Sequence, residues 1–215
     1  MAAGKPDTRQ ALLKAAVKLF GEAGFDATST REIAREANAN ISAISYHFGG
    51  KDKLRLACAE YVAERLARVA ARPQDQPQPR TPQQAAIALE KLVSNLVEAL
   101  LSQPGAPELA QFVLREIARP GEVLDLVFPR FLAPAHQRAC DLWALATGEG
   151  PESPAVRLAV FSILGQVVYF RLGQALVCKR MGWNEFGPEQ IRAIEDSILG
   201  NLRVALATTS KGSEQ

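Results

Sequence analysis

The sequence is poor in the residues from which disulfide frameworks and metal sites are built. It has three cysteines, Cys58, Cys140 and Cys178, which lie far apart, and two histidines, His47 and His136. An odd number of scattered cysteines without a CxxC pair favours a reducing compartment and argues against a disulfide framework or a zinc site. We therefore expect no metal site and no bound cofactor.

Long apolar runs are also missing. The longest mainly apolar stretch without a charged residue is thirteen residues, Leu158 to Phe170, whereas a membrane-spanning helix needs about 20 apolar residues. The first ten residues lack the apolar core of a signal peptide. Hydrophobic residues make up 47% of the chain and charged residues 22%, a balance that suits a packed core better than a disordered chain. We expect a soluble, cytoplasmic globular protein without a membrane segment.

Motifs of the common enzyme classes are absent as well. The sequence contains no G-x-S-x-G, H-E-x-x-H, P-loop or dinucleotide-binding pattern. Its carboxylates are scattered over polar helix faces, as on an ordinary surface. These absences disfavour catalysis, and we predict no catalytic residue.

Strand signals are missing, and almost every segment has the apolar spacing of a helix. The sequence predicts an all-α protein of about nine helices, at roughly 7–23, 29–37, 41–48, 51–71, 82–103, 107–118, 122–147 (interrupted near Pro129 and Pro134), 154–181 and 188–207. Residues 72–82 contain four of the thirteen prolines, which predicts a connector. We expect one domain over residues 1–50 and a larger helical domain over residues 51–215.

The first fifty residues have the pattern of a helix-turn-helix. Ser29-x-x-Glu32 forms a capping box, Asn38-Ala-Asn40 suits a tight turn, and Ile44 and Phe48 face inward at i, i+4. The outward residues of the third helix are small or polar, which suits a major groove about 12 Å wide. Residues 1–72 also hold twelve Lys or Arg against eight Asp or Glu, a modest basic excess that favours a nucleic-acid partner.

Two longer stretches resemble a known family. The run from Leu19 to Ala34, followed by Ser45-Tyr46-His47-Phe48-Gly49-Gly50-Lys51, resembles the DNA-binding domain of TetR-family transcriptional regulators. The segments 114–120 and 161–171 resemble the C-terminal domain of the CecR-type members of that family. The resemblance implies a dimeric regulator that binds a palindromic operator in double-stranded DNA and responds to a small-molecule effector of unknown identity. Repression is the commoner mode in the family.

The resemblance also implies which residues contact DNA. Phosphates fall to Ser29, Thr30 and Arg31 at the start of the second helix, to Tyr46 and His47 near the end of the third, and to Lys51. Base edges fall to Asn40, Ile41, Ser42, Ala43 and Ser45. The family often has a basic residue at the position of Ile41 and glycine at the position of Asn38, and no Lys or Arg lies on the third helix, so the operator sequence is not predicted. The alternatives are that Ser29 is only a helix cap and that Tyr46 and His47 only pack against neighbouring helices.

The last two long helices supply the expected dimer interface. The helix over 154–181 is apolar nearly all round, and the helix over 188–207 has a stripe that includes Ile194, Ile198 and Leu202. In the family these helices pair with their copies in a four-helix bundle, which predicts a homodimer. The alternative is that both apolar faces are buried inside one protomer.

The remaining helices are the place where the family binds its effectors. Aromatic residues with a few polar groups among them are typical of such pockets. We expect ligand contacts from Phe112, Arg115, Glu116, Phe131, Trp143, Gln166 and Tyr169. The alternative for the aromatic residues is an ordinary core. An alternative function for the whole chain is a helical small-molecule-binding or interaction protein without specific DNA binding.

Overall fold

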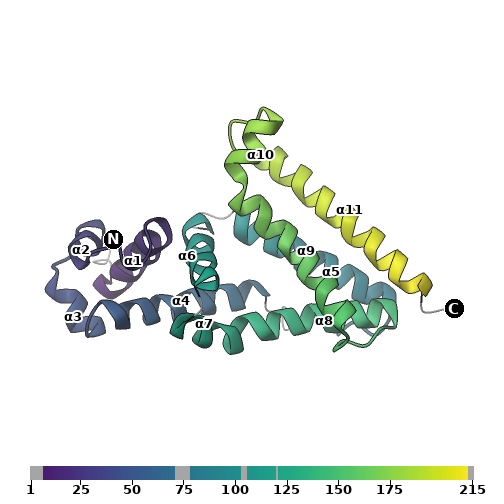
Figure 1. The fold of residues 1–215 in the computed structure, drawn as a ribbon, viewed down its shortest axis with the longest axis horizontal. Helices are drawn as coiled ribbons and strands as arrows, with labels where there is room; N and C mark the ends of the chain where they lie inside the picture. Colours follow the sequence, from purple (N-terminus) through teal and green to yellow (C-terminus); the bar gives the residue numbers. More distant parts are fainter. Residues whose placement is uncertain (1–6, 71–77, 103–105, 120, 213–215) are drawn as a thin grey trace, which may run out of the picture. The chain divides into compact units, whose positions relative to one another are not determined.

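The fold is known from a computed structural model that describes residues 7–70, 78–102, 106–119 and 121–212. These residues form helices α1 to α11 and two π-helical turns, with no strand among them (Figure 1). The predicted all-α class is confirmed. Of the predicted connector at 72–82, residues 72–77 lie outside the described residues. It ends at the start of α5, where the hydroxyl of the N-cap Thr81 accepts a hydrogen bond from the backbone N–H of Gln84.

The chain folds as two compact units. The first unit comprises Met1–Leu66 and Pro107–Phe131. It therefore holds α1 (Thr8–Glu22), α2 (Thr30–Glu36), α3 (Ser42–Phe48), most of α4 (Lys51–Ala70), nearly all of α6 (Ala106–Ala118) and α7 (Glu122–Val127). The chain passes between the units three times, after Leu66, Ala106 and Phe131.

The second unit comprises Ala67–Ala106 and Leu132–Gln215. Its long helices are α5 (Pro82–Val97), α8 (Ala133–Thr147), α9 (Pro154–Leu172) and α11 (Pro188–Gly212), with the short α10 (Gln174–Met181) and the π-helical turn η1 (Glu98–Ser102) between them. Helix α5 packs against α8, α9 and α11, and α8 also packs against α9 and α11. Val93, Trp143, Ile198 and Leu202 are buried where these helices meet.

Two predicted helices are each divided. The segment predicted as one helix over 154–181 is α9 and α10, which are separated at Gly173. A Cβ on that residue would lie 3.0 Å from the carbonyl oxygen of Tyr169, so a larger residue would crowd this turn. The segment over 122–147 is α7, the π-helical turn η2 (Phe128–Leu132) and α8. The interruption falls at the predicted prolines because Pro129 has no N–H to donate and Pro134 is best placed in a first turn.

Helix α9 is long and apolar enough to cross a membrane by length and composition alone, the one such helix among the described residues. This is weak evidence for a membrane span, because helices of soluble proteins pass the same test. Only 22% of its apolar window is buried inside the protomer. Its exposed apolar side chains include Leu158, Phe161 and Leu172, so this helix has a large apolar surface that no other part of the described protomer covers.

Candidate DNA-binding site

Helices α2 and α3 are joined by a tight turn of the kind that the sequence predicted. Asn38 adopts the left-handed conformation, with φ of 49°, and the backbone N–H of Ala39 donates to the carbonyl of Ala34 at 2.8 Å. The side-chain oxygen of Asn40 then accepts hydrogen bonds from the backbone N–H and the hydroxyl of Ser42, both at 2.9 Å. The asparagine was expected to be the N-cap of a helix that begins at Ile41. Helix α3 begins one residue later, its N-cap position is Ile41 without a side-chain cap hydrogen bond, and the Asn40 side chain instead holds the turn before it.

Helix α3 is anchored on one face and open on the other. Ile44 is 1% exposed and Phe48 is also buried, whereas Ile41 is 44% and Tyr46 85% exposed. Ser42 and Ser45 are exposed, and Ala43 and His47 are half-buried. The inward and outward faces are those predicted. A tyrosine with this exposure is unusual in a protein that only needs a packed core, and it is available to a partner.

The start of α2 is closed by a complete capping box. The Ser29 hydroxyl accepts from the backbone N–H of Glu32 at 3.2 Å, and the Glu32 carboxylate accepts from the backbone N–H and the hydroxyl of Ser29, both at 2.7 Å. These hydrogen bonds from Ser29 lower the pKa of the Glu32 carboxyl below its ordinary value. The Ser29 hydroxyl therefore has a structural role, and its contact with phosphate stays a prediction, as do those of Thr30 and Arg31.

Basic side chains near α3 lie over aromatic rings. The Lys51 ammonium lies 4.2 Å from the centre of the Phe25 ring, and the Arg9 guanidinium lies 5.2 Å from the centre of the Phe48 ring. Tyr46 and His47 meet edge to face, with ring centres 5.0 Å apart. Cation–π contacts at exposed sites contribute about 0.5–1 kcal/mol, so they favour these positions of the Lys51 and Arg9 side chains.

The predicted effector contacts are divided between the two units. In the first unit Phe112 is buried, Phe131 is half-buried, and Arg115 and Glu116 both have partners within the protein. In the second unit Trp143 is buried, Tyr169 is exposed, and the side-chain oxygen of Gln166 accepts a hydrogen bond from Asn201 at 2.7 Å. The burial of Phe112 and Trp143 also suits the alternative of an ordinary core, and the whole set stays a prediction.

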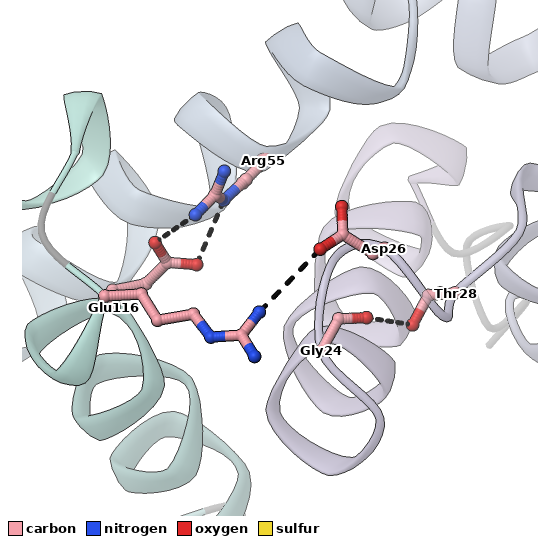
Figure 2. Close-up of polar contacts among 6 residues, drawn as sticks. Gly24, Asp26, Thr28, Arg55 and Glu116 are labelled. Atoms are coloured by element: carbon pink, nitrogen blue, oxygen red, sulfur yellow. Dashed lines mark hydrogen bonds and ion pairs between the residues drawn. The ribbon is translucent and has the colours of Figure 1, made fainter.

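The partners of Arg115 and Glu116 lie far away in the sequence. The Arg115 guanidinium donates to the carbonyls of Gly21 and Glu22, both at 2.6 Å. The Glu116 carboxylate accepts two hydrogen bonds from Arg55 of α4, at 3.0 and 2.5 Å (Figure 2). This pair raises the pKa of the Arg55 guanidinium. Sequence patterns gave no signal for these contacts, because the residues are 61 to 94 positions apart.

The predicted dimer helices differ in what they bury. In α11 the predicted stripe of Ile194, Ile198 and Leu202 is buried within the protomer, which is the alternative outcome for that helix. In α9 and α10 the apolar residues Phe161, Leu172 and Leu176, which belong to the predicted interface, are exposed. Apolar surface that could meet a second copy is therefore on α9 and α10, and α11 has mainly small outward residues around the exposed Val204.

Among the described residues, no group of three or more His, Cys, Asp and Glu side chains could hold a metal ion.

The anchored α3, with its exposed polar face and the capped α2 beside it, places the chain in the class of helix-turn-helix DNA-binding proteins.

Comparison with known proteins identifies the family. Residues 12–58 match the family described as bacterial regulatory proteins, tetR family, and residues 85–209 match the C-terminal domain of the HTH-type transcriptional dual regulator CecR. The HTH-type transcriptional dual regulator CecR of Shigella flexneri is 33% identical over 214 residues, which cover 95% of this chain and 94% of the relative. The chain belongs to the TetR family of transcriptional regulators.

Solved structures show the same fold. AibR in complex with isovaleryl coenzyme A and operator DNA is 19% identical, with a TM-score of 0.64 over 90% of this chain and 97% of that one. A putative TetR-family regulator from Rhodococcus sp. is 16% identical, with a TM-score of 0.66 over 93% of this chain and 98% of that one. At these identities the likeness concerns the fold alone.

Proposed function

We propose that this transcriptional regulator acts as a homodimer that binds a palindromic operator, represses transcription in its DNA-bound form and is released by a small-molecule effector. The observation that carries the DNA-reading part is the anchored helix α3, in which Ile44 and Phe48 are buried and Tyr46 is 85% exposed. The reading function would lie in residues 1–50, and regulation and dimerisation in residues 51–215. The cytoplasm is the compartment in which such a regulator meets its DNA.

We call residues 1–50 the reading head. The chemistry of its side chains suggests which of them contact phosphates and which contact bases. Ser29, Thr30, Arg31, Tyr46, His47 and Lys51 would contact phosphates, and Asn40, Ile41, Ser42, Ala43 and Ser45 would contact base edges. Phosphate contacts fix the register of a protein on DNA without carrying sequence information, whereas base contacts select the site. Since α3 has no Lys or Arg, selectivity would come from hydroxyls, one amide and apolar contact with thymine methyl groups.

Dimerisation would use α9 together with the outward face of α11. Support comes from the uncovered apolar side chains Leu158, Phe161 and Leu172 of α9 and from the contact of α9 with α11 within the protomer. A two-fold axis would bring two copies of this pair together, and it would also place two reading heads on the two half-sites of a palindrome. Covering apolar surface of this kind is what distinguishes a permanent interface from a transient one.

The effector would bind within the helical regulatory part of the chain, residues 51–215, from which all the predicted ligand contacts come. AibR was crystallised with isovaleryl coenzyme A, and this compound is therefore a reasonable first probe. A ligand that binds only the folded state, at a free concentration of 100 times its Kd, raises the free energy of unfolding by about 2.7 kcal/mol. Thermal unfolding with and without isovaleryl coenzyme A, and then with a wider ligand panel, would identify a binder.

The test of DNA reading is selection from a random duplex library, followed by a salt series on the selected duplex. A palindrome should be enriched. The logarithm of the binding constant should fall linearly with the logarithm of the salt concentration, with a slope of about −0.9 for each phosphate that the protein neutralises. Failure of the wild-type protein to enrich any duplex would contradict the proposal. It would favour the second candidate, a helical ligand-binding or interaction protein. The relatives are transcriptional regulators, and we propose that the activity is binding and not catalysis.

A further inference from the structure

Helix α6 holds the end of α1 by completing its hydrogen bonding. The last carbonyls of a helix have no partner within the helix. In α1, the carbonyl of Leu19 accepts from Ala23 and that of Phe20 accepts from Gly24. The next two carbonyls, of Gly21 and Glu22, are the ones that accept from Arg115. A guanidinium at this position also meets the negative end of the helix dipole, so Arg115 is a cap supplied from a distant helix.

The neighbouring residue of α6 holds α4. Glu116 is buried, with 10% of its side chain exposed, and its two oxygens accept from Nε and Nη2 of Arg55. Two-point pairing fixes the direction of both side chains more strictly than a single contact does. The same guanidinium lies 4.8 Å from the centre of the Phe25 ring, in the loop between α1 and α2. A third contact, between Arg119 and Asp26, is 3.7 Å long and almost fully exposed, and such pairs contribute little.

The backbones of α1 and α6 also come unusually close. A Cβ added to Gly21 would lie 3.0 Å from the carbonyl oxygen of Glu108 and 3.2 Å from the backbone nitrogen of Phe112. These are backbone atoms and cannot rotate away, so a larger residue at position 21 would require α1 and α6 to move apart by a few tenths of an ångström. Close approach, the Arg115 cap and the Glu116–Arg55 pair therefore act at one place, which we call the α6 clamp.

The clamp has a topological consequence. The first unit is connected to the second by three chain crossings, of which one follows α4 and two flank the segment with α6 and α7. If α6 were not held to α1 and α4, the helices α1–α4 would be connected to the second unit by the crossing after Leu66, and to the segment with α6 and α7 mainly by the exposed ion pair between Arg130 and Glu60. With the clamp in place, all three crossings restrain the same body.

We propose that Arg115 and Glu116 are positioning residues for operator binding, because they make α6 part of the DNA-reading body and so restrain the two heads of a dimer at a defined separation. The inference rests on the proposed function. It replaces the sequence-based role of these two residues as ligand contacts. A head with a fixed separation from its partner gains from the second half-site through effective concentration, and a loosely connected head loses this gain.

The experiment compares a full palindrome with a single half-site. Both duplexes come from the selection with wild-type protein, and the variants are Arg115→Ala, Glu116→Gln and the uncharged steric variant Gly21→Ala. Because two-site binding commonly gains 10²–10⁴-fold in affinity, loss of a fixed separation should weaken palindrome binding about 10-fold or more. Half-site affinity should stay within about two-fold of wild type, because phosphate and base contacts of α2 and α3 are unchanged.

A matched control is Glu36→Gln, which breaks the ion pair between Glu36 and Lys18 within the head and does not involve α6. It should leave the ratio of palindrome to half-site affinity unchanged. The exchanged pair Arg55→Glu with Glu116→Arg should restore part of the ratio that each single variant loses. Amide hydrogen exchange of the free protein should show faster exchange in α6 in the clamp variants, with α2 and α3 unchanged.

The outcomes separate the two proposals. If wild type binds the palindrome and the clamp variants keep the same ratio of affinities, the positioning role is wrong and the proposed function stands. If a variant loses palindrome and half-site binding equally, the clamp only stabilises the head, and the positioning role is again wrong. If wild-type protein enriches no duplex, the proposed function fails and this inference fails with it.

Discussion

Two isoleucines of the recognition segment, three residues apart and very unequally exposed, allow the anchoring of α3 to be tested against its DNA contacts. Ile44 is 1% exposed and Ile41 is 44% exposed. Replacing Ile44 with alanine removes three buried carbons, at about 0.8 kcal/mol each, and leaves a cavity. Together these effects should destabilise the protein by about 2–5 kcal/mol. Ile41→Ala should change stability by no more than about 0.5 kcal/mol, as surface substitutions do.

The assay is urea unfolding followed by two signals. Both tryptophans, Trp143 and Trp183, belong to the second unit, so tryptophan fluorescence reports on that unit, whereas far-ultraviolet circular dichroism reports on all helices. Ile44→Ala should move the part of the dichroism transition that comes from the first unit to lower urea. The same midpoint for Ile44→Ala and Ile41→Ala would refute the anchored arrangement of α3.

DNA affinity should show the opposite order. When both variants are folded, Ile41→Ala should weaken operator binding more than Ile44→Ala does. Ile41→Ala should lower affinity for the selected operator by about 1 kcal/mol, or roughly five-fold, through lost apolar contact. It should also change the preferred base at one position of each half-site. Unchanged operator affinity and unchanged base preference would remove Ile41 from the set of base contacts.

Four further predictions concern single groups. Tyr46→Ala should weaken binding to all duplexes alike, because a phosphate contact carries no sequence information; a changed site preference at equal affinity would contradict this role. Ser29→Ala should cost about 1 kcal/mol of stability through loss of the α2 cap, measured by urea unfolding. Because the folded pKa of Glu32 is lowered, its contribution to the cap is present above the unfolded pKa and disappears as the pH falls through the folded one, so Glu32→Gln should have a weaker acid dependence of helicity. Burial raises the pKa of the Cys58 thiol, and a thiol reagent at neutral pH should modify it only after unfolding.

The sequence was sufficient where the determining interactions are local. The capping box at Ser29 and Glu32, the tight turn at Asn38-Ala-Asn40 and the inward face of α3 all depend on residues within four positions of one another. Each of these predictions is confirmed. Contacts of this kind can be predicted from a single sequence, because one side chain forms a hydrogen bond with one unpaired backbone group a few residues away.

The sequence was insufficient where partners are distant. The sequence does not distinguish a ligand-binding role of Arg115 and Glu116 from a structural one, since both roles require charged groups on an apolar helix. Their partners are Gly21, Glu22 and Arg55, and only the fold brings these residues together. The close approach of α6 to Gly21 could not be predicted either, because a glycine inside a helix does not by itself indicate that another backbone lies beside it.

The same reasoning explains why the dimer helices were predicted as a pair but behave differently. A stripe of Ile and Leu shows that a helix face must be covered, but not whether the cover comes from its own chain or from a second copy. In α11 the cover is intramolecular, since Ile198 and Leu202 are fully buried in the protomer. In α9, Phe161 and Leu172 remain exposed after the protomer has folded. The apolar surface available for dimerisation is therefore concentrated on α9 and α10. A charged substitution at Phe161 should separate the subunits without unfolding them, whereas one at Ile198 should unfold the second unit first.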